Sequence, residues 1–128
     1  MATLTFRKRE RMVRRRLIDD LFGGGGSCSL AAFPLRAVYK LHDRNPEDAP
    51  VQMLVSVPKK HFRHAVDRNR VKRQVREVWR LHKSLLAETI AADKQLLVAF
   101  VWLSEQHLAT RAVEERMVSL MRRIAERL

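Results

Sequence analysis

Residues 67–80, with the sequence DRNRVKRQVREVWR, constrain the fold of this chain more than any other segment. At about 100° per residue, the apolar positions of this segment and of its continuation share one side of a helix. These positions are Val71, Val75, Val78, Trp79, His82, Leu85 and Leu86. Such a stripe is typical of a helix packed on a core, so the pattern predicts an amphipathic helix that ends near residue 87, with His82 in the core.

The opposite side of this helix carries a row of cations at helical spacing. It consists of Asn69 together with Arg70, Lys72, Arg73, Arg76, Arg80 and Lys83. Glu77 is the only acid between residues 68 and 83, so nothing within the helix is expected to neutralise the row. Because like charges at this spacing repel and reduce helix stability, the row indicates a binding partner outside the chain.

The positive charge of the chain is concentrated in two segments. The chain contains 26 Lys and Arg residues against 14 Asp and Glu residues, a net charge of +12. Residues 7–16 carry seven cations and one acid, and residues 58–83 carry ten cations and two acids, so these segments supply the whole excess. Cations clustered in this way on a folded domain indicate a polyanion site rather than a surface charged only for solubility.

An anionic membrane is the alternative partner for such a surface. A helix that lies on a membrane must expose its apolar face to lipid, whereas the apolar faces of this chain are needed for the core. No run of 18 apolar residues occurs, so no membrane span is expected. The N-terminal cations are not followed by the apolar run of a secretory signal, and we therefore expect a cytoplasmic protein.

The remaining segments predict helices packed on a small sheet. Helices are expected at residues 8–22 and 110–128, and strands at residues 35–41, 51–57 and 95–103. Four glycines at positions 23–26 should end the first helix, and the order of residues 23–30 is left open. Strands 35–41 and 51–57 should form an antiparallel hairpin, because a polar turn region joins them. We predict one α+β domain spanning residues 1–128, a two-layer α-β sandwich with a small mixed sheet.

No catalytic centre is indicated by the residues of this chain. The single cysteine, Cys28, excludes an internal disulfide and a cysteine-based zinc site. The acids are scattered rather than clustered, unlike those that hold the divalent ions of a metal-dependent nuclease, and no nucleophile motif occurs. We therefore expect no catalytic residue and no metal ligand in the protein.

Binding chemistry is better supported than catalysis. Arg side chains donate paired hydrogen bonds to phosphate groups, and Lys adds point charge. His61 and His64 lie among cations and are expected to face RNA. Phe22 and Tyr39 could stack on bases or pack in the core, and the sequence leaves both roles open.

Two segments around the cationic helix form a specific motif. These segments are SVPKK at residues 56–60 and AVDRNRVKR at residues 65–73. The motif, with its Arg-Asn-Arg triplet followed by Lys-Arg, resembles the signature of the bacterial ribonuclease P protein component. LTFRKRER at residues 4–11 and LFG at residues 21–23 are also similar to that family, so the resemblance covers nearly the whole chain.

The resemblance implies the small protein subunit of an RNA-based enzyme that removes 5′ leaders from precursor tRNA. In that family the RNA subunit carries out the hydrolysis with bound Mg²⁺, and no cofactor is expected on the protein. The implied partners are ribonuclease P RNA and precursor tRNA, with no membrane and no obligate protein partner. The implied fold has a left-handed crossover around the Arg-Asn-Arg helix, contrary to the usual right-handed preference. A general nucleic-acid-binding or ribosome-associated protein of similar fold is the alternative.

The resemblance also assigns roles to individual residues. Contacts with the catalytic RNA are implied for Lys59, Lys60, Arg68, Asn69, Arg70, Lys72, Arg73 and Arg76. A leader-binding cleft between the first helix and the sheet is implied for Ile18, Phe22 and Tyr39, and additional basic contacts for Arg7, Lys8, Arg9 and Arg11. The chain departs from the family pattern at Ile18, where many members have Phe, and at residues 61–64, where many have a shorter loop that contains Gly.

Overall fold

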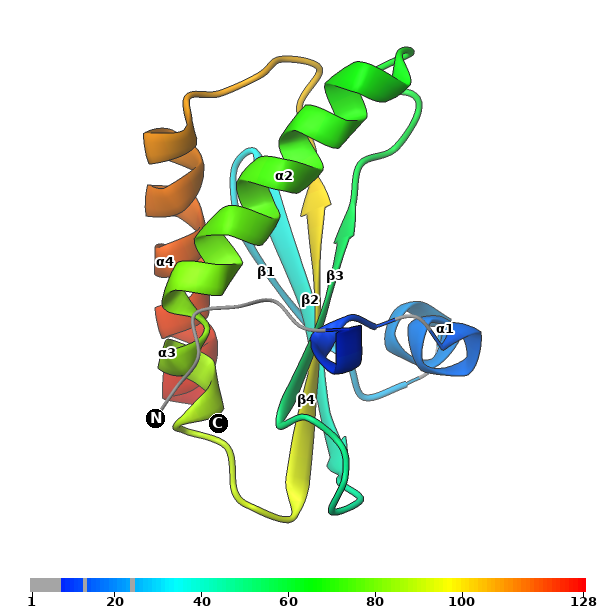
Figure 1. The fold of residues 1–128 in the computed structure, drawn as a ribbon, viewed down its shortest axis with the longest axis vertical. Helices are drawn as coiled ribbons and strands as arrows, with labels where there is room; N and C mark the ends of the chain where they lie inside the picture. Colours follow the sequence, from blue (N-terminus) through cyan, green and yellow to red (C-terminus); the bar gives the residue numbers. More distant parts are fainter. Residues whose placement is uncertain (1–7, 13, 24) are drawn as a thin grey trace.

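The structure, a computed structural model, describes residues 8–12, 14–23 and 25–128 and combines helices with one mixed sheet (Figure 1). The helices are a 3-10 turn η1 at Lys8–Glu10, then α1 at Arg15–Gly23, α2 at Ala65–His82, α3 at Ser84–Ala87 and α4 at Thr110–Arg127. The strands are β1 at Cys28–Ala32, β2 at Leu35–Asp43, β3 at Val51–Ser56 and β4 at Lys94–Trp102. The predicted α+β class and the predicted cationic and C-terminal helices are confirmed.

The strand order of the sheet is β1-β2-β4-β3, with β1, β2 and β4 antiparallel and β3 parallel to β4. The predicted hairpin between residues 35–41 and 51–57 is therefore wrong, because β4 lies between these two strands. Six consecutive residues of β4, at positions 95–100, are buried, which is typical of a strand covered on both faces and paired on both edges. The connection from β3 to β4 contains α2 and occupies the place of the implied crossover.

Helices α2 and α4 cover one face of the sheet, and α1 lies against the other face (Figure 1). The larger core cluster lies between the sheet and the two long helices. It contains Trp79, Phe100 and Trp102, and the rings of Trp79 and Phe100 are 6.0 Å apart. A smaller cluster beneath α1 contains Met12, Leu21, Val38, Leu97 and Ala99. The sheet and the long helices thus form the predicted sandwich, and α1 partly covers the outer face.

The predicted first helix is interrupted between η1 and α1. Met12 is only 2% exposed, its backbone N–H donates to the carbonyl of Met53, and Arg11 forms an isolated parallel bridge with Met53. Pairing with the free edge of β3 therefore replaces helical hydrogen bonds at this point, in a segment whose repelling cations disfavour a continuous helix. Within the described residues, no helix is long and apolar enough to cross a membrane.

Candidate nucleic-acid interface

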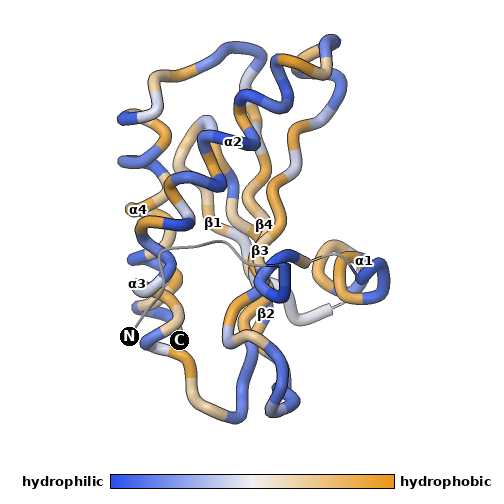
Figure 2. The backbone as a smooth tube through the Cα atoms, viewed as in Figure 1, coloured by the Kyte–Doolittle hydropathy of each residue, from blue (hydrophilic) through white to orange (hydrophobic). Residues whose placement is uncertain are grey.

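Helix α2 has the two unlike faces that the sequence predicts. Val71, Val75 and Val78 are at most 1% exposed and pack in the core. The opposite face presents Asn69, Arg70, Arg73 and Arg76 to solvent, with Lys72 and Arg68 half-buried at its margin. Figure 2 shows the resulting alternation of hydrophilic and hydrophobic segments along the helix. The buried valines hold this cationic face on a rigid support.

Three of the exposed arginines have no partner among the residues that the structure describes. The side chains of Arg70, Arg73 and Arg76 form no hydrogen bond or ion pair there. Lys59 and Lys60 are also exposed, in the turn that precedes the helix. The structure thus brings most of the residues implied for RNA contact onto the N-terminal two-thirds of α2 and the turn before it.

The prediction that nothing within the helix neutralises the row, so that its partner lies outside the chain, is wrong at the C-terminal end of the row. Arg80 donates to Glu77 over 2.6 Å, and Lys83 forms an ion pair with Glu10 from η1. The hydrogen bond from Arg80 lowers the pKa of Glu77, so this carboxylate keeps its charge and its partner to a lower pH than an unpaired glutamate does. The cations without described partners therefore lie in the N-terminal two-thirds of α2.

Arg68 has a different environment from its neighbours in the motif. Its Nη1 donates to the backbone carbonyls of Phe62 and Arg63, at 2.7 and 3.0 Å. Phe62 itself is only 7% exposed, so the segment before α2 is packed rather than loose. Arg68 anchors this connection, a role that is additional to the RNA contact implied by the sequence.

Substitution of Arg68 should therefore affect stability. We expect Arg68→Ala to lower the free energy of unfolding by about 1–2 kcal/mol, because two carbonyls lose a charged donor. Arg70→Ala, a matched control on the same turn, should change it by less than about 0.5 kcal/mol. Denaturant unfolding measures both, and equal values for the two variants would contradict the anchoring role.

The histidines occupy three kinds of position. His64 is exposed at the start of α2, and His61 is half-buried beside it. The core position predicted for His82 is wrong: this side chain is 32% exposed, and its Nε2 lies 2.8 Å from a carboxylate oxygen of Glu114 on α4. His82 lies at the edge of the apolar sector, where a polar partner on the neighbouring helix is within reach.

His107 is a residue that sequence reasoning missed. It lies in the connection between β4 and α4, where no periodic pattern marks it. Its ring stacks on Phe62 with 4.5 Å between centroids and 15° between planes, and its Nε2 lies 3.1 Å from Oδ1 of Asp67. His107 therefore contacts both the segment before α2 and the first turn of α2.

The opposite face of the sheet holds part of the implied leader cleft. Ile18 is half-buried and packs on the smaller core cluster, whereas Phe22, four residues later on α1, is 47% exposed. Arg36 on β2 is exposed and donates to Ser29, and Lys40 pairs with Asp20 of α1 at 2.9 Å. The even-numbered positions of β2 thus face α1.

The predicted place of Tyr39 in this cleft is wrong. Tyr39 is 5% exposed and belongs to the larger core cluster, on the sheet face covered by α2 and α4. It shares that face with Leu35 and Ala37 because side chains alternate along a strand. Of the two roles left open for Tyr39, core packing is the one observed.

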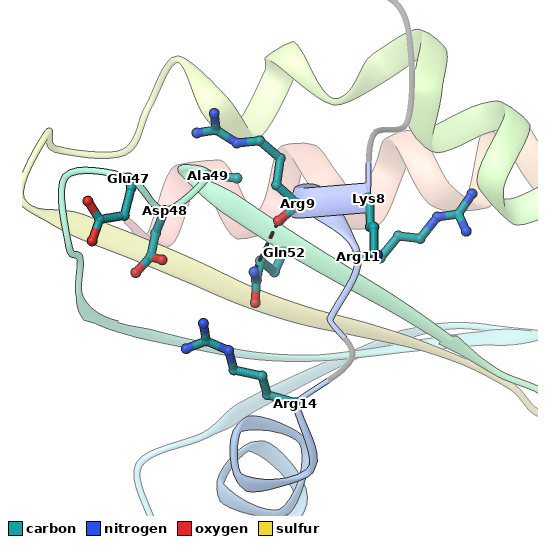
Figure 3. Close-up of a pocket in the computed structure, with 8 residues that line it drawn as sticks. All are labelled: Lys8, Arg9, Arg11, Arg14, Glu47, Asp48, Ala49 and Gln52. Carbon is teal, nitrogen blue, oxygen red and sulfur yellow. Dashed lines mark hydrogen bonds between the residues drawn. The ribbon is translucent and has the colours of Figure 1, made fainter.

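The second cationic segment borders an open cavity of about 610 Å³ (Figure 3). The cavity is lined by Lys8, Arg9, Arg11, Arg14, Glu47, Asp48, Ala49 and Gln52. Arg9 and Arg14 extend toward the side of the carboxylates, while Arg11 extends the other way. Gln52 donates to the backbone carbonyl of Arg9 over 3.1 Å, which fixes η1 to β3. Arg7 lies outside the described residues, and Arg14 was not among the predicted contacts.

The donor chemistry of the described part of the chain is that of a cationic binding surface. It contains no group of three or more His, Cys, Asp or Glu residues that could hold a metal ion. Cys28 is a free, exposed thiol. The surface presents arginine guanidinium groups and lysine ammonium groups on a helix. Both groups bind phosphate, the first through paired hydrogen bonds and the second through its charge.

Comparisons with known proteins agree with this chemistry. The family model of ribonuclease P matches residues 6–125. The ribonuclease P protein component of Porphyromonas gingivalis is 42% identical over 126 residues, which cover 97% of this chain and 89% of that protein. The RNase P protein from Thermotoga maritima has a similar fold, with a TM-score of 0.67 at 24% identity over 89% of this chain and 96% of that one. A Staphylococcus aureus RNase P protein mutant gives a TM-score of 0.67 at 23% identity over 93% and 90% of the two chains. The chain belongs to the ribonuclease P protein family.

Proposed function

We propose that this protein binds ribonuclease P RNA through the cationic end of α2 and guides the 5′ leader of precursor tRNA across the opposite side of the sheet. Family membership implies the role in tRNA 5′ leader processing, with catalysis by the RNA subunit. The observation that carries the proposal is the set of exposed arginines on α2 that have no partner in the described structure. A rigid helix that presents such groups is suited to phosphates held in a fixed arrangement.

The proposed contact with the catalytic RNA comprises two adjacent segments. These are Lys59 and Lys60 before α2, and Asn69, Arg70, Lys72, Arg73 and Arg76 on its exposed face. Helical spacing places the arginines along one ridge, so they can contact successive phosphates of a folded RNA. Counterion release would make this binding strongly dependent on salt concentration.

The proposed leader contact lies around α1. Phe22 offers an exposed aromatic ring, and Ile18 beside it offers an aliphatic surface. The cavity lined by Lys8, Arg9 and Arg14 adds cations at the start of the same helix. A single strand can use both features, since its backbone is attracted to cations and its bases stack on aromatic rings. Mg²⁺ would be bound by the RNA, and the reaction would take place in the cytoplasm.

Removal of the Phe22 ring should affect precursor tRNA more than mature tRNA. We expect Phe22→Ala to weaken precursor binding to the holoenzyme by about fivefold, a loss of about 1 kcal/mol that is typical of one stacked base. Mature tRNA, which lacks the leader, should bind as before. The control is Phe33→Ala, which removes another exposed aromatic ring, 66% exposed in the turn between β1 and β2. Equal losses for precursor and mature tRNA in fluorescence titrations would contradict the leader contact.

Selective affinity for ribonuclease P RNA distinguishes the proposal from a general nucleic-acid-binding protein. Titration of the purified protein with ribonuclease P RNA and with duplex DNA of arbitrary sequence, at the same salt concentration, compares the two affinities. We expect tighter binding to ribonuclease P RNA by at least about 10³-fold, the lower end of ordinary specificity ratios. Equal affinities would favour the general binding role.

A further inference from the structure

We propose that His107 is a positioning residue that keeps an acidic side chain, Asp67, away from the RNA-binding arginines of α2. Asp67 lies in the first turn of α2, beside the cations that the proposed function assigns to RNA. The inference rests on that function, because it assumes that Arg70 contacts phosphate. His107 would act through Asp67 and need not touch the RNA.

The first turns of α2 bring an acid and several cations close together. Asp67 is the only acid of this end of the helix, and Arg70 follows it by three residues. Side chains three residues apart are neighbours on a helix surface, so the carboxylate of Asp67 is within reach of the Arg70 guanidinium. Such a pair would neutralise a cation that the RNA needs. The structure contains no ion pair between these two described residues.

Asp67 is held instead by a residue from another part of the chain. Its Oδ1 lies 3.1 Å from Nε2 of His107, and the two side chains are 40% and 23% exposed. Because an ionised carboxylate can only accept, Nε2 of His107 is the nitrogen that donates to Asp67. Nδ1 of His107 is buried and has no hydrogen-bond partner among the described residues. The carboxylate is thus drawn toward the connection between β4 and α4.

The position of the His107 ring is fixed by its neighbours. The ring stacks on Phe62, which is 7% exposed, with the planes only 15° apart. The connection that carries His107 is itself tied to α2, because Nε2 of Gln74 donates to the carbonyl of Leu108 and to Oγ1 of Thr110, at 2.9 and 3.1 Å. The connection runs past the N-terminal half of α2 (Figure 1), so His107 reaches Asp67 from a segment that is hydrogen-bonded to the same helix.

This end of α2 has an acid in its first turn but no side-chain N-cap. His64, at the N-cap position, makes no side-chain capping hydrogen bond. Cations near a helix N-terminus oppose the helix dipole, whereas an acid there is favourable. Asp67 can therefore stabilise the first turn electrostatically, while its contact with His107 draws the carboxylate toward the connection between β4 and α4. The contact between His107 and Asp67 therefore leaves the acid in the first turn of α2 and holds its carboxylate on the side of His107.

The test is a titration of ribonuclease P RNA with His107→Ala at several salt concentrations. Release of Asp67 should weaken binding by about threefold to tenfold and reduce the slope of log K against log salt by about 0.7–0.9, the equivalent of one phosphate contact. His107→Gln, which retains an amide donor, should bind like the wild type. Gln106→Ala, an exposed neighbour in the same connection, is the matched control and should also be unchanged.

A second substitution separates positioning from simple stabilisation. Adding Asp67→Ala to His107→Ala should restore both the affinity and the salt slope, while the melting temperature stays at or below that of His107→Ala. A double variant that binds as weakly as His107→Ala would overturn the inference, and so would a His107→Gln protein that is as weak as the alanine variant. Circular dichroism of each variant verifies that the chain is folded.

Arg70→Ala is measured in the same series. If His107→Ala binds RNA like the wild type, this variant shows whether the positioning role of His107 or the proposed RNA interface is wrong. If Arg70→Ala weakens binding while folded His107→Ala does not, the positioning role is wrong and the proposed interface stands. If Arg70→Ala binds like the wild type, the proposed interface is wrong at this position and the inference fails with it.

Discussion

Replacement of Arg70, Arg73 and Arg76 together by alanine should weaken binding to ribonuclease P RNA by about 10²–10³-fold near physiological salt. These side chains are exposed, and no described residue pairs with them, so they are available for phosphate groups. Loss of three contacts should reduce the slope of log K against log salt by about 2–3, since each phosphate contact contributes about 0.7–0.9. The melting temperature should stay constant or rise slightly, because repulsion along the helix is removed.

The control for this variant removes the same charge from another helix. Arg111, Arg122 and Arg127 are exposed on α4, and their replacement by alanine lowers the net charge by the same amount. We expect at most a few-fold change in RNA affinity for this protein. Equal losses for the α2 and α4 variants would show that net charge, and not the face of α2, governs binding.

Trp79→Ala should cause the largest loss of stability among single substitutions on α2. Trp79 is 1% exposed and packs against Phe100 of the central strand. Removal of a large buried aromatic side chain costs about 3–5 kcal/mol, which is a substantial part of the 5–15 kcal/mol typical of a whole domain. The cationic face would then lose its support, and RNA affinity should fall although no cation has been removed.

The matched control for Trp79→Ala lies on the same helix. Leu81 is 41% exposed, so Leu81→Ala should lower the free energy of unfolding by less than about 1 kcal/mol and leave RNA affinity unchanged. Urea unfolding measures both variants. A loss for Trp79→Ala no greater than that for Leu81→Ala would contradict the placement of Trp79 in the core.

The features that could be predicted from the sequence are those that depend only on residues within one continuous segment. The two faces of helix α2 can be predicted because apolar and cationic residues alternate at the helical period over 18 residues. The strand order could not be predicted in this way. The observed pairing joins β2 to β4, whose paired residues are more than 50 positions apart in the sequence, whereas the turn signal between β2 and β3 favoured the wrong neighbour.

In the candidate site, too, local features could be predicted from the sequence and features that depend on distant segments could not. The exposed positions of Arg70, Arg73 and Arg76 follow from the helical period. The side of the sheet on which Tyr39 lies does not, because both faces of β2 are covered and the apolar residues at positions 37–39 leave no clear alternation. The contacts of Arg68 and His107 involve irregular segments, whose positions depend on the packed fold rather than on a local pattern.

Cleavage of precursor tRNA at low Mg²⁺ tests the central claim most directly. The reaction contains precursor tRNA with ribonuclease P RNA alone, with the protein alone, or with both. We predict little cleavage by the RNA alone, none by the protein alone, and efficient release of the 5′ leader when both are present. Cleavage by the protein without RNA, or no gain when the protein is added to the RNA, would contradict the account.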